Sequence, residues 1–243
     1  MKKFLAVLIL VLISSATVSA APTCVMMKFT NDTRYQNIDS AAVLSDLVLE
    51  KLLASGKFNF VETRPLDENL ELQLYDEKAR DILAAETGAK RGNFNILFEN
   101  GTFDKNHAQS ISTAQVGQII SPSITSQIGE AHNADYLIHG TIIAMGDGNI
   151  AESSRQNNIY AYHKEAVMAI SADVKIINAK TGEVIWRKNA VGSKKTELVQ
   201  VGKIIVGTAK LSAEMYNTAM NRCAEKIVAD LIADVDANKL FVK

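Results

Sequence analysis

The feature that most constrains the fold is a strand–turn–strand pattern in residues 173–190, DVKIINAKTGEVIWRKNA. Val174 and Ile176 share one face of the first predicted strand, and Val184 and Trp186 share one face of the second. Gly182 can adopt the positive φ that ends a type I turn with a bulge. Because both strands carry consecutive apolar residues, we expect a core hairpin under helices with Trp186 buried. The alternative is a binding edge anchored by Trp186.

Helical patterns flank this hairpin on both sides. Apolar residues recur at helical spacing from Ser40 to Gly56, between predicted strands at 23–31 and 57–64, which makes a βαβ-type unit. Ser212 is the N-cap candidate of a last helix that extends to Val235. Its apolar stripe consists of Tyr216, Met220, Cys223, Ile227 and Leu231. The sequence therefore predicts an α+β fold, a mixed α/β sandwich in which helices pack on a single sheet of about five strands.

The first twenty residues, MKKFLAVLILVLISSATVSA, have the layout of a secretory signal peptide. Two lysines precede the apolar run 4–13, which is too short to span a bilayer, and Val18-Ser19-Ala20 offers a cleavage site. We expect residues 1–20 to be removed and the mature chain to start at Ala21. Pro22 disrupts the small-residue pattern that lipidation of Cys24 needs, so we expect no lipid anchor.

Residues 21–243 are predicted to form a single domain, since this length suits one core and the chain has only three prolines. Exposed loops are expected near 91–109, where glycines and asparagines replace any periodicity, and near 146–166. We expect the partner-binding surface in these two loops.

The charge balance excludes several kinds of partner. Removal of Lys2 and Lys3 lowers the basic residues from 26 to 24 against 27 acidic residues, a net charge of −3. Nucleic-acid binding requires a clustered basic surface, and attachment to acidic lipids requires a polybasic patch. The net negative charge therefore argues against nucleic acids and acidic lipid surfaces as partners. No later segment has the apolar length of a transmembrane helix.

The two cysteines, Cys24 on the first strand and Cys223 on the last helix, leave two alternatives open. A disulfide is common in exported proteins, whereas two buried free thiols also pack well in a core.

The chain shows no recognisable catalytic motif. His107, His132, His139 and His163 have no metal-ligand spacing with one another or with cysteine. Nucleophile elbows, phosphate loops and HExxH helices are also missing. We therefore predict no catalytic residue, no cofactor, no metal site and no enzymatic activity.

Three stretches together resemble a known family. They are VLSDLVLEKLLASGKFNFVETR at 43–64, SQIGEAHNADYLIHGTI at 126–142 and VKIINAKTGEVIW at 174–186. They are similar to the curli production assembly/transport component (CsgG-like) family, which is related to LpoB-type lipoproteins and to the N-terminal domain of TolB. The resemblance extends from about Cys24 to Val235. Its motifs mark turns and strand ends, so it implies a fold more strongly than a function.

The resemblance implies an exported, non-enzymatic cell-envelope protein whose partner is another envelope or secreted protein. We expect a periplasmic interaction module, monomeric or homo-oligomeric, that serves envelope or surface-protein assembly. The alternative is a subunit of an outer-membrane secretion pore, to which each copy contributes amphipathic hairpins. Residues 146–166 and 188–207 are the corresponding segments. Polar residues in the first and Lys194, Lys195 and Lys203 in the second depart from the alternation of lipid-facing strands.

Overall fold

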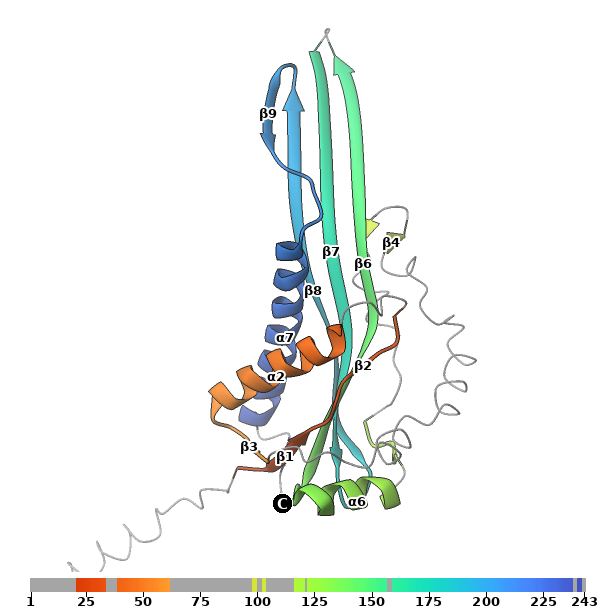
Figure 1. The fold of residues 1–243 in the computed structure, drawn as a ribbon, viewed down its shortest axis with the longest axis vertical. Helices are drawn as coiled ribbons and strands as arrows, with labels where there is room; N and C mark the ends of the chain where they lie inside the picture. Colours follow the sequence, from red (N-terminus) through yellow and green to blue (C-terminus); the bar gives the residue numbers. More distant parts are fainter. Residues whose placement is uncertain are drawn as a thin grey trace, which may run out of the picture.

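The computed structural model describes residues 21–33, 39–61, 98–99, 102–103, 116–120, 122–156, 159–237 and 240–241. A mixed sheet with helices on both faces occupies most of these ranges, which confirms the predicted fold class (Figure 1). The sheet has seven strands rather than about five. The first predicted strand is in fact two short strands, and a four-residue strand at 204–207 is an addition.

The elements follow one another along the chain with these bounds: β1 (Thr23–Met26), β2 (Thr30–Asn31), α2 (Ser40–Ser55), β3 (Asn59–Phe60), β4 (Phe98–Glu99), β5 (Thr102–Phe103), α6 (Pro122–His132), β6 (Tyr136–Gln156), β7 (Ile159–Asn178), β8 (Val184–Val201), β9 (Ile204–Gly207) and α7 (Ala213–Asp236). The large sheet has the order β3-β1-β6-β7-β8-β9, and β2 also pairs with β6. The pairs β1–β3, β1–β6 and β2–β6 are parallel, whereas β6 to β9 form an antiparallel ladder.

Helices α2 and α7 cover one face of the sheet, called here the helix face. Helix α2 begins after Asp39, whose side chain accepts a hydrogen bond from the Ala42 amide, and ends at Gly56 with a φ of 64°. Helix α7 begins after Ser212, whose hydroxyl accepts from the Met215 amide, as predicted. The predicted stripe of α7 is confirmed, because Met220, Cys223, Ile227 and Leu231 are fully buried and Tyr216 is partly buried. They pack with Val174, Ile176 and Trp186 in one core cluster.

The opposite face of the sheet has a second, smaller core near α6. Ile128 of this helix packs with Val25, Leu137, Ile177 and Val184 from four strands. Figure 1 shows α6 at the lower end of the sheet, the end where β8 begins. The two cores therefore hold the lower half of the sheet between helices.

The predicted hairpin forms as expected. Asn178 and Gly182 close the turn, since the Gly182 amide donates to the Asn178 carbonyl at 2.8 Å and Gly182 has a φ of 71°. A bulge lies next to the turn, because Ile177 pairs with Val184 and Ile176 with Trp186, which leaves Ile185 of β8 as the extra residue. Trp186 is 4% exposed, and its Nε1 donates to Asp234 Oδ2 at 3.1 Å. Trp186 is thus a core residue, which confirms the expected burial.

The expectation of an exposed loop near 146–166 is wrong. These residues continue β6 and β7 as a regular antiparallel pair from Gly146–Ala169 to Gln156–Ile159. They are strand because hydrogen bonds between the two segments satisfy the backbone even where few side chains are buried. Of the other expected loop, 91–109, only β4 and β5 are described; they pair with each other, and the rest of that segment lies outside the described residues.

Gly192 on β8 is the point where α7 lies closest to the sheet. A Cβ atom there would lie 2.0 Å from the Ala219 carbonyl oxygen and 2.3 Å from the Cys223 nitrogen. Both are backbone atoms, so the helix would have to move. We expect Gly192→Ala to lower the free energy of unfolding by about 1–3 kcal/mol, the usual cost of overpacking, as measured by urea denaturation. Ser193→Ala, whose side chain points to the opposite face, should change stability little; equal stability of the two variants would contradict this close packing.

Candidate functional site

The candidate site is the part of the sheet that extends beyond the helices, called here the arm. It consists of residues 150–156 of β6, 159–165 of β7 and 197–207, which include the end of β8, a turn and β9. Figure 1 shows these strands projecting past the N-terminal end of α7. The length of the arm is about 20 Å, since six residue steps separate Ile150 from Gln156. The arm is built from the two segments, 146–166 and 188–207, that the family resemblance marks as hairpins.

The arm concentrates exposed apolar side chains. Seven of the twelve exposed large hydrophobic residues in the described part of the chain belong to it: Ile159, Tyr160, Val199, Val201, Ile204, Ile205 and Val206. Ile204 and Val206 are 69% and 65% exposed. Scattered single apolar residues are ordinary on protein surfaces, but a contiguous group marks an interaction surface.

The strand register assigns these side chains to faces, since directly paired residues share a face and successive residues alternate. Val199 pairs with Val206 and Val201 with Ile204, so these four side chains form one apolar patch on the opposite face. Tyr160 and Ile205 lie on the helix face, where the rings of Tyr160 and Tyr162 are stacked with centroids 6.5 Å apart. Both faces of the arm near its tip therefore offer apolar contact.

The two edges of the arm differ in character. The β6 edge has the largely polar sequence NIAESSRQ at 149–156, whereas the β9 edge has the apolar sequence IIVG at 204–207. Among the described residues, no strand pairs with the outer edge of β6 beyond Ile142 or with that of β9. Unpaired strand edges can pair with an added strand. The arm thus combines two available edges with an apolar patch on the β8–β9 side.

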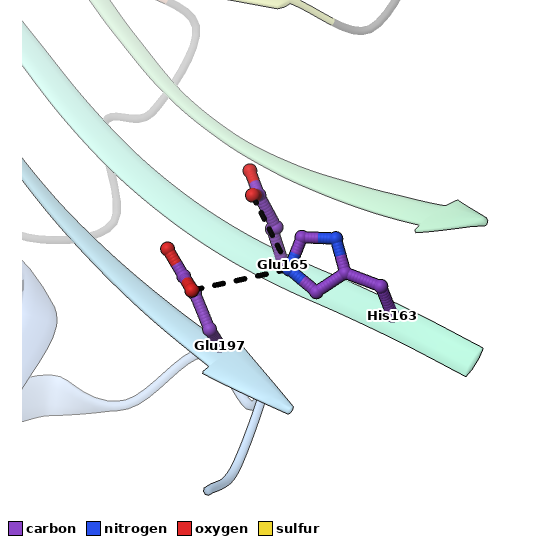
Figure 2. Close-up of side chains that lie close together, drawn as sticks. All are labelled: His163, Glu165 and Glu197. Carbon is purple, nitrogen blue, oxygen red and sulfur yellow. Dashed lines mark ion pairs between the residues drawn. The ribbon is translucent and has the colours of Figure 1, made fainter. Parts of the chain in front are cut away.

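A charged cluster lies on the opposite face where the arm leaves the domain. Lys195 Nζ lies 2.5 Å from Glu165 Oε1 and 2.9 Å from Glu197 Oε1, so one ammonium bridges two carboxylates. His163 Nε2 lies 3.5 Å from Glu165 Oε1 (Figure 2). The hydrogen bonds from Lys195 to Glu165 and Glu197 raise the pKa of Lys195, and the bond from Lys195 lowers the pKa of Glu197. The cluster holds β7 and β8 together below the apolar patch.

Within the domain, the opposite face contains a buried ion pair. Arg187 Nε lies 2.7 Å from Asp173 Oδ1, and these side chains are 8% and 2% exposed. Burial lowers the pKa of the neighbouring Lys175, and Asp173 and Arg187 contribute in opposite directions. A buried acid paired with arginine is a structural ion pair, because loss of either partner leaves an uncompensated charge.

The histidines and cysteines that the sequence singled out are separated in the structure. His132 and His139 are buried, His163 lies on the arm, and His107 is outside the described residues. Of the two alternatives for the cysteines, the structure contains two free, buried thiols in one core cluster. Burial raises the pKa of Cys24 and of Cys223 to about 12 in each case. Such thiols are protonated near neutral pH and are poor nucleophiles.

Sequence reasoning missed the cluster of His163, Glu165 and Glu197. The spacing of histidines relative to one another and to cysteines does not reveal this cluster, and Glu197 joins it only through the β7–β8 register. The one available signal was the His-x-Glu spacing, which places both side chains on one face of a strand. Among the described helices, none is long and apolar enough to cross a membrane.

Comparison with known proteins gives remote structural likenesses. The hypothetical protein CT253 from Chlamydia trachomatis is 11% identical, with a TM-score of 0.41 over 91% of this chain and 99% of that chain. The C-terminal domain of LpoB from Escherichia coli is 12% identical, with a TM-score of 0.35 over 77% and 93%. The PelC dodecamer from Paraburkholderia phytofirmans is 10% identical, with a TM-score of 0.36 over 86% and 85%. At such low identities and scores these likenesses carry no functional inference.

No curated protein matches the chain. A family match is found, however, with the curli production assembly/transport component CsgG over residues 109–242, which is more than half of the chain and includes the whole arm. The chain therefore belongs to the CsgG family.

Proposed function

We propose that the chain is an exported, non-enzymatic component of the cell envelope that binds another envelope or secreted protein through the arm. In this proposal, residues 21–243 form one mature domain located in the periplasm. The domain serves envelope or surface-protein assembly. The family membership supports the envelope role, and the arm supports the mode of binding.

The observation that carries the proposal is the apolar patch of Val199, Val201, Ile204 and Val206. No described helix covers it, and it lies on paired strands at the end of the sheet rather than on a loop. A partner that covers the patch removes apolar surface from water, which stabilises the complex by about 25 cal/mol per Å² of apolar area. The polar β6 edge and the charged cluster at the base surround the patch, as polar rims surround apolar interface centres.

A double variant tests the role of the patch. Ile204→Asp combined with Val206→Asp should abolish partner binding, because two carboxylates would have to be desolvated in the interface. Both positions are largely exposed, so the melting temperature should stay close to that of the wild type. Leu53→Asp, at an exposed apolar position on α2 far from the arm, is the matched control.

Binding is measured by site-specific photo-crosslinking in the cells that naturally produce the protein. A photoreactive residue in place of Val201, whose side chain belongs to the patch and is 49% exposed, should give an adduct of one discrete mass with another protein, and the adduct should disappear in the double variant. The same photoreactive residue at position 53 should not give this adduct. Absence of an adduct at position 201, or the same adduct at both positions, contradicts the proposal.

A second candidate function is the subunit of a secretion pore. The two unpaired edges of the arm favour it, since β6 and β9 run in opposite directions. Pairing of β9 of one copy with β6 of another would therefore continue the antiparallel order of the sheet. The arm fits a membrane less well, because its length of about 20 Å is below the roughly 30 Å of a hydrocarbon core and residues 149–156 are mostly polar.

Size measurement separates the two candidates. The interaction module should extract without detergent and give the mass of a monomer or small oligomer by light scattering. The pore subunit should require detergent and give a large ring, in which a photoreactive residue at position 205 on the β9 edge crosslinks two copies of this chain.

A further inference from the structure

The charged cluster at the base of the arm has the side chains of a metal site. His163 and Glu165 lie on one face of β7, and Glu197 lies directly across from Glu165 on β8 (Figure 2). His163 Nε2 lies 3.5 Å from Glu165 Oε1 and 3.9 Å from Glu197 Oε2. One ligand atom from each residue lies within 4.8 Å of the other two.

These separations are close to those that a small divalent cation requires. Zinc binds imidazole nitrogen and carboxylate oxygen at about 2.0–2.2 Å, so two ligands of a tetrahedral ion lie about 3.3–3.6 Å apart. The observed 3.5 Å lies within this range and the observed 3.9 Å is only slightly longer. One imidazole with two carboxylates also favours zinc-like ions over Mg²⁺ and Ca²⁺, which prefer oxygen ligands throughout.

The ammonium of Lys195 is a second observation that points to a cation. Two carboxylates directly opposite each other in a sheet repel, yet Glu165 and Glu197 converge on one point. Lys195 Nζ occupies it, at 2.5 and 2.9 Å from the two carboxylates. The lysine side chain is 45% exposed and enters from solvent, so it can leave without disturbing the core.

We propose that His163, Glu165 and Glu197 bind a zinc-like divalent cation, which displaces the Lys195 ammonium from between the two carboxylates. Glu165 is largely shielded, whereas His163 and Glu197 are 36% and 51% exposed, so an ion from solution can reach the site. The metal joins β7 to β8 at the base of the arm and neutralises the two carboxylates beside the apolar patch.

Titration of the purified mature chain with Zn²⁺ tests the site. After dialysis against a chelator, isothermal calorimetry near neutral pH should show one saturable equivalent per chain. His163→Ala and Glu165→Gln should each weaken binding at least about tenfold, as loss of a ligand does. Asp230→Asn, which removes an exposed carboxylate from the Lys226–Asp230 pair on α7, should leave the affinity unchanged.

Lys195→Ala distinguishes displacement of the ammonium from simple attraction to surface charge. Removal of the competing ammonium should tighten Zn²⁺ binding several-fold, and Zn²⁺ should raise the melting temperature of this variant more than that of the wild type. Absence of saturable binding overturns the proposal. So does binding that survives His163→Ala, or an affinity that Lys195→Ala leaves unchanged or weaker.

Discussion

Ile227→Asp is expected to leave the domain unfolded at room temperature. Ile227 is fully buried on α7, in the core that the helix shares with α2 and the sheet. An unpaired carboxylate at this position costs several kcal/mol, which is comparable to the whole stability of a domain, roughly 5–15 kcal/mol. The measurement is circular dichroism with thermal denaturation of the purified variant.

Ala229→Asp is the matched control for this variant. Ala229 lies two residues further along the same helix and is exposed, so the same side chain there should cost little. A cooperative transition of Ile227→Asp near the wild-type melting temperature would show that the apolar side of α7 does not pack on the sheet.

Trp186→Ala is expected to lower the free energy of unfolding by about 3–5 kcal/mol, the usual cost of emptying an aromatic site in a core. The indole packs in the same cluster as Ile176 and Ile227. Trp186 is the only tryptophan, so the wild-type fluorescence reports this site alone. Its emission should be blue-shifted and poorly quenched by acrylamide.

Trp186→Phe separates packing from hydrogen bonding. Phenylalanine keeps most of the apolar contact but loses the bond from Nε1 to Asp234 Oδ2. We expect a smaller decrease in the free energy of unfolding than for Trp186→Ala, of which about 1 kcal/mol is due to the hydrogen bond. Ready quenching of the wild-type fluorescence would instead place the tryptophan at the surface and support its role as a binding anchor.

The sequence predicts those elements in which burial of one face produces a regular spacing of apolar residues. The apolar stripe and N-cap of α7, and the paired strands around Asn178–Gly182, are examples. Strand β2, by contrast, is only two residues long and cannot show a period. This short strand and the four residues of β9 make the difference between the expected and observed sheets.

The strand conformation of the β6 side of the arm was missed for a different physical reason. Residues 149–156 are exposed or half-buried on both faces, so selection for burial leaves no alternation to detect. Their strand conformation depends on the backbone pairing with β7. The charged cluster depends on the same pairing, because Glu197 and His163 are neighbours only through the β7–β8 register. The pattern of residues within one segment does not show which residues of two strands pair with each other.

The continuity of β7 has a mechanical consequence. This strand runs without interruption from Ile159 at the tip to Asn178 beside α6 and is paired on both sides along most of its length. A pull on the tip along the strand direction therefore acts in shear on many hydrogen bonds at once, instead of opening them one after another. A partner that pulls on the arm in this direction would transmit its force to the core beneath α7 before the arm itself yields.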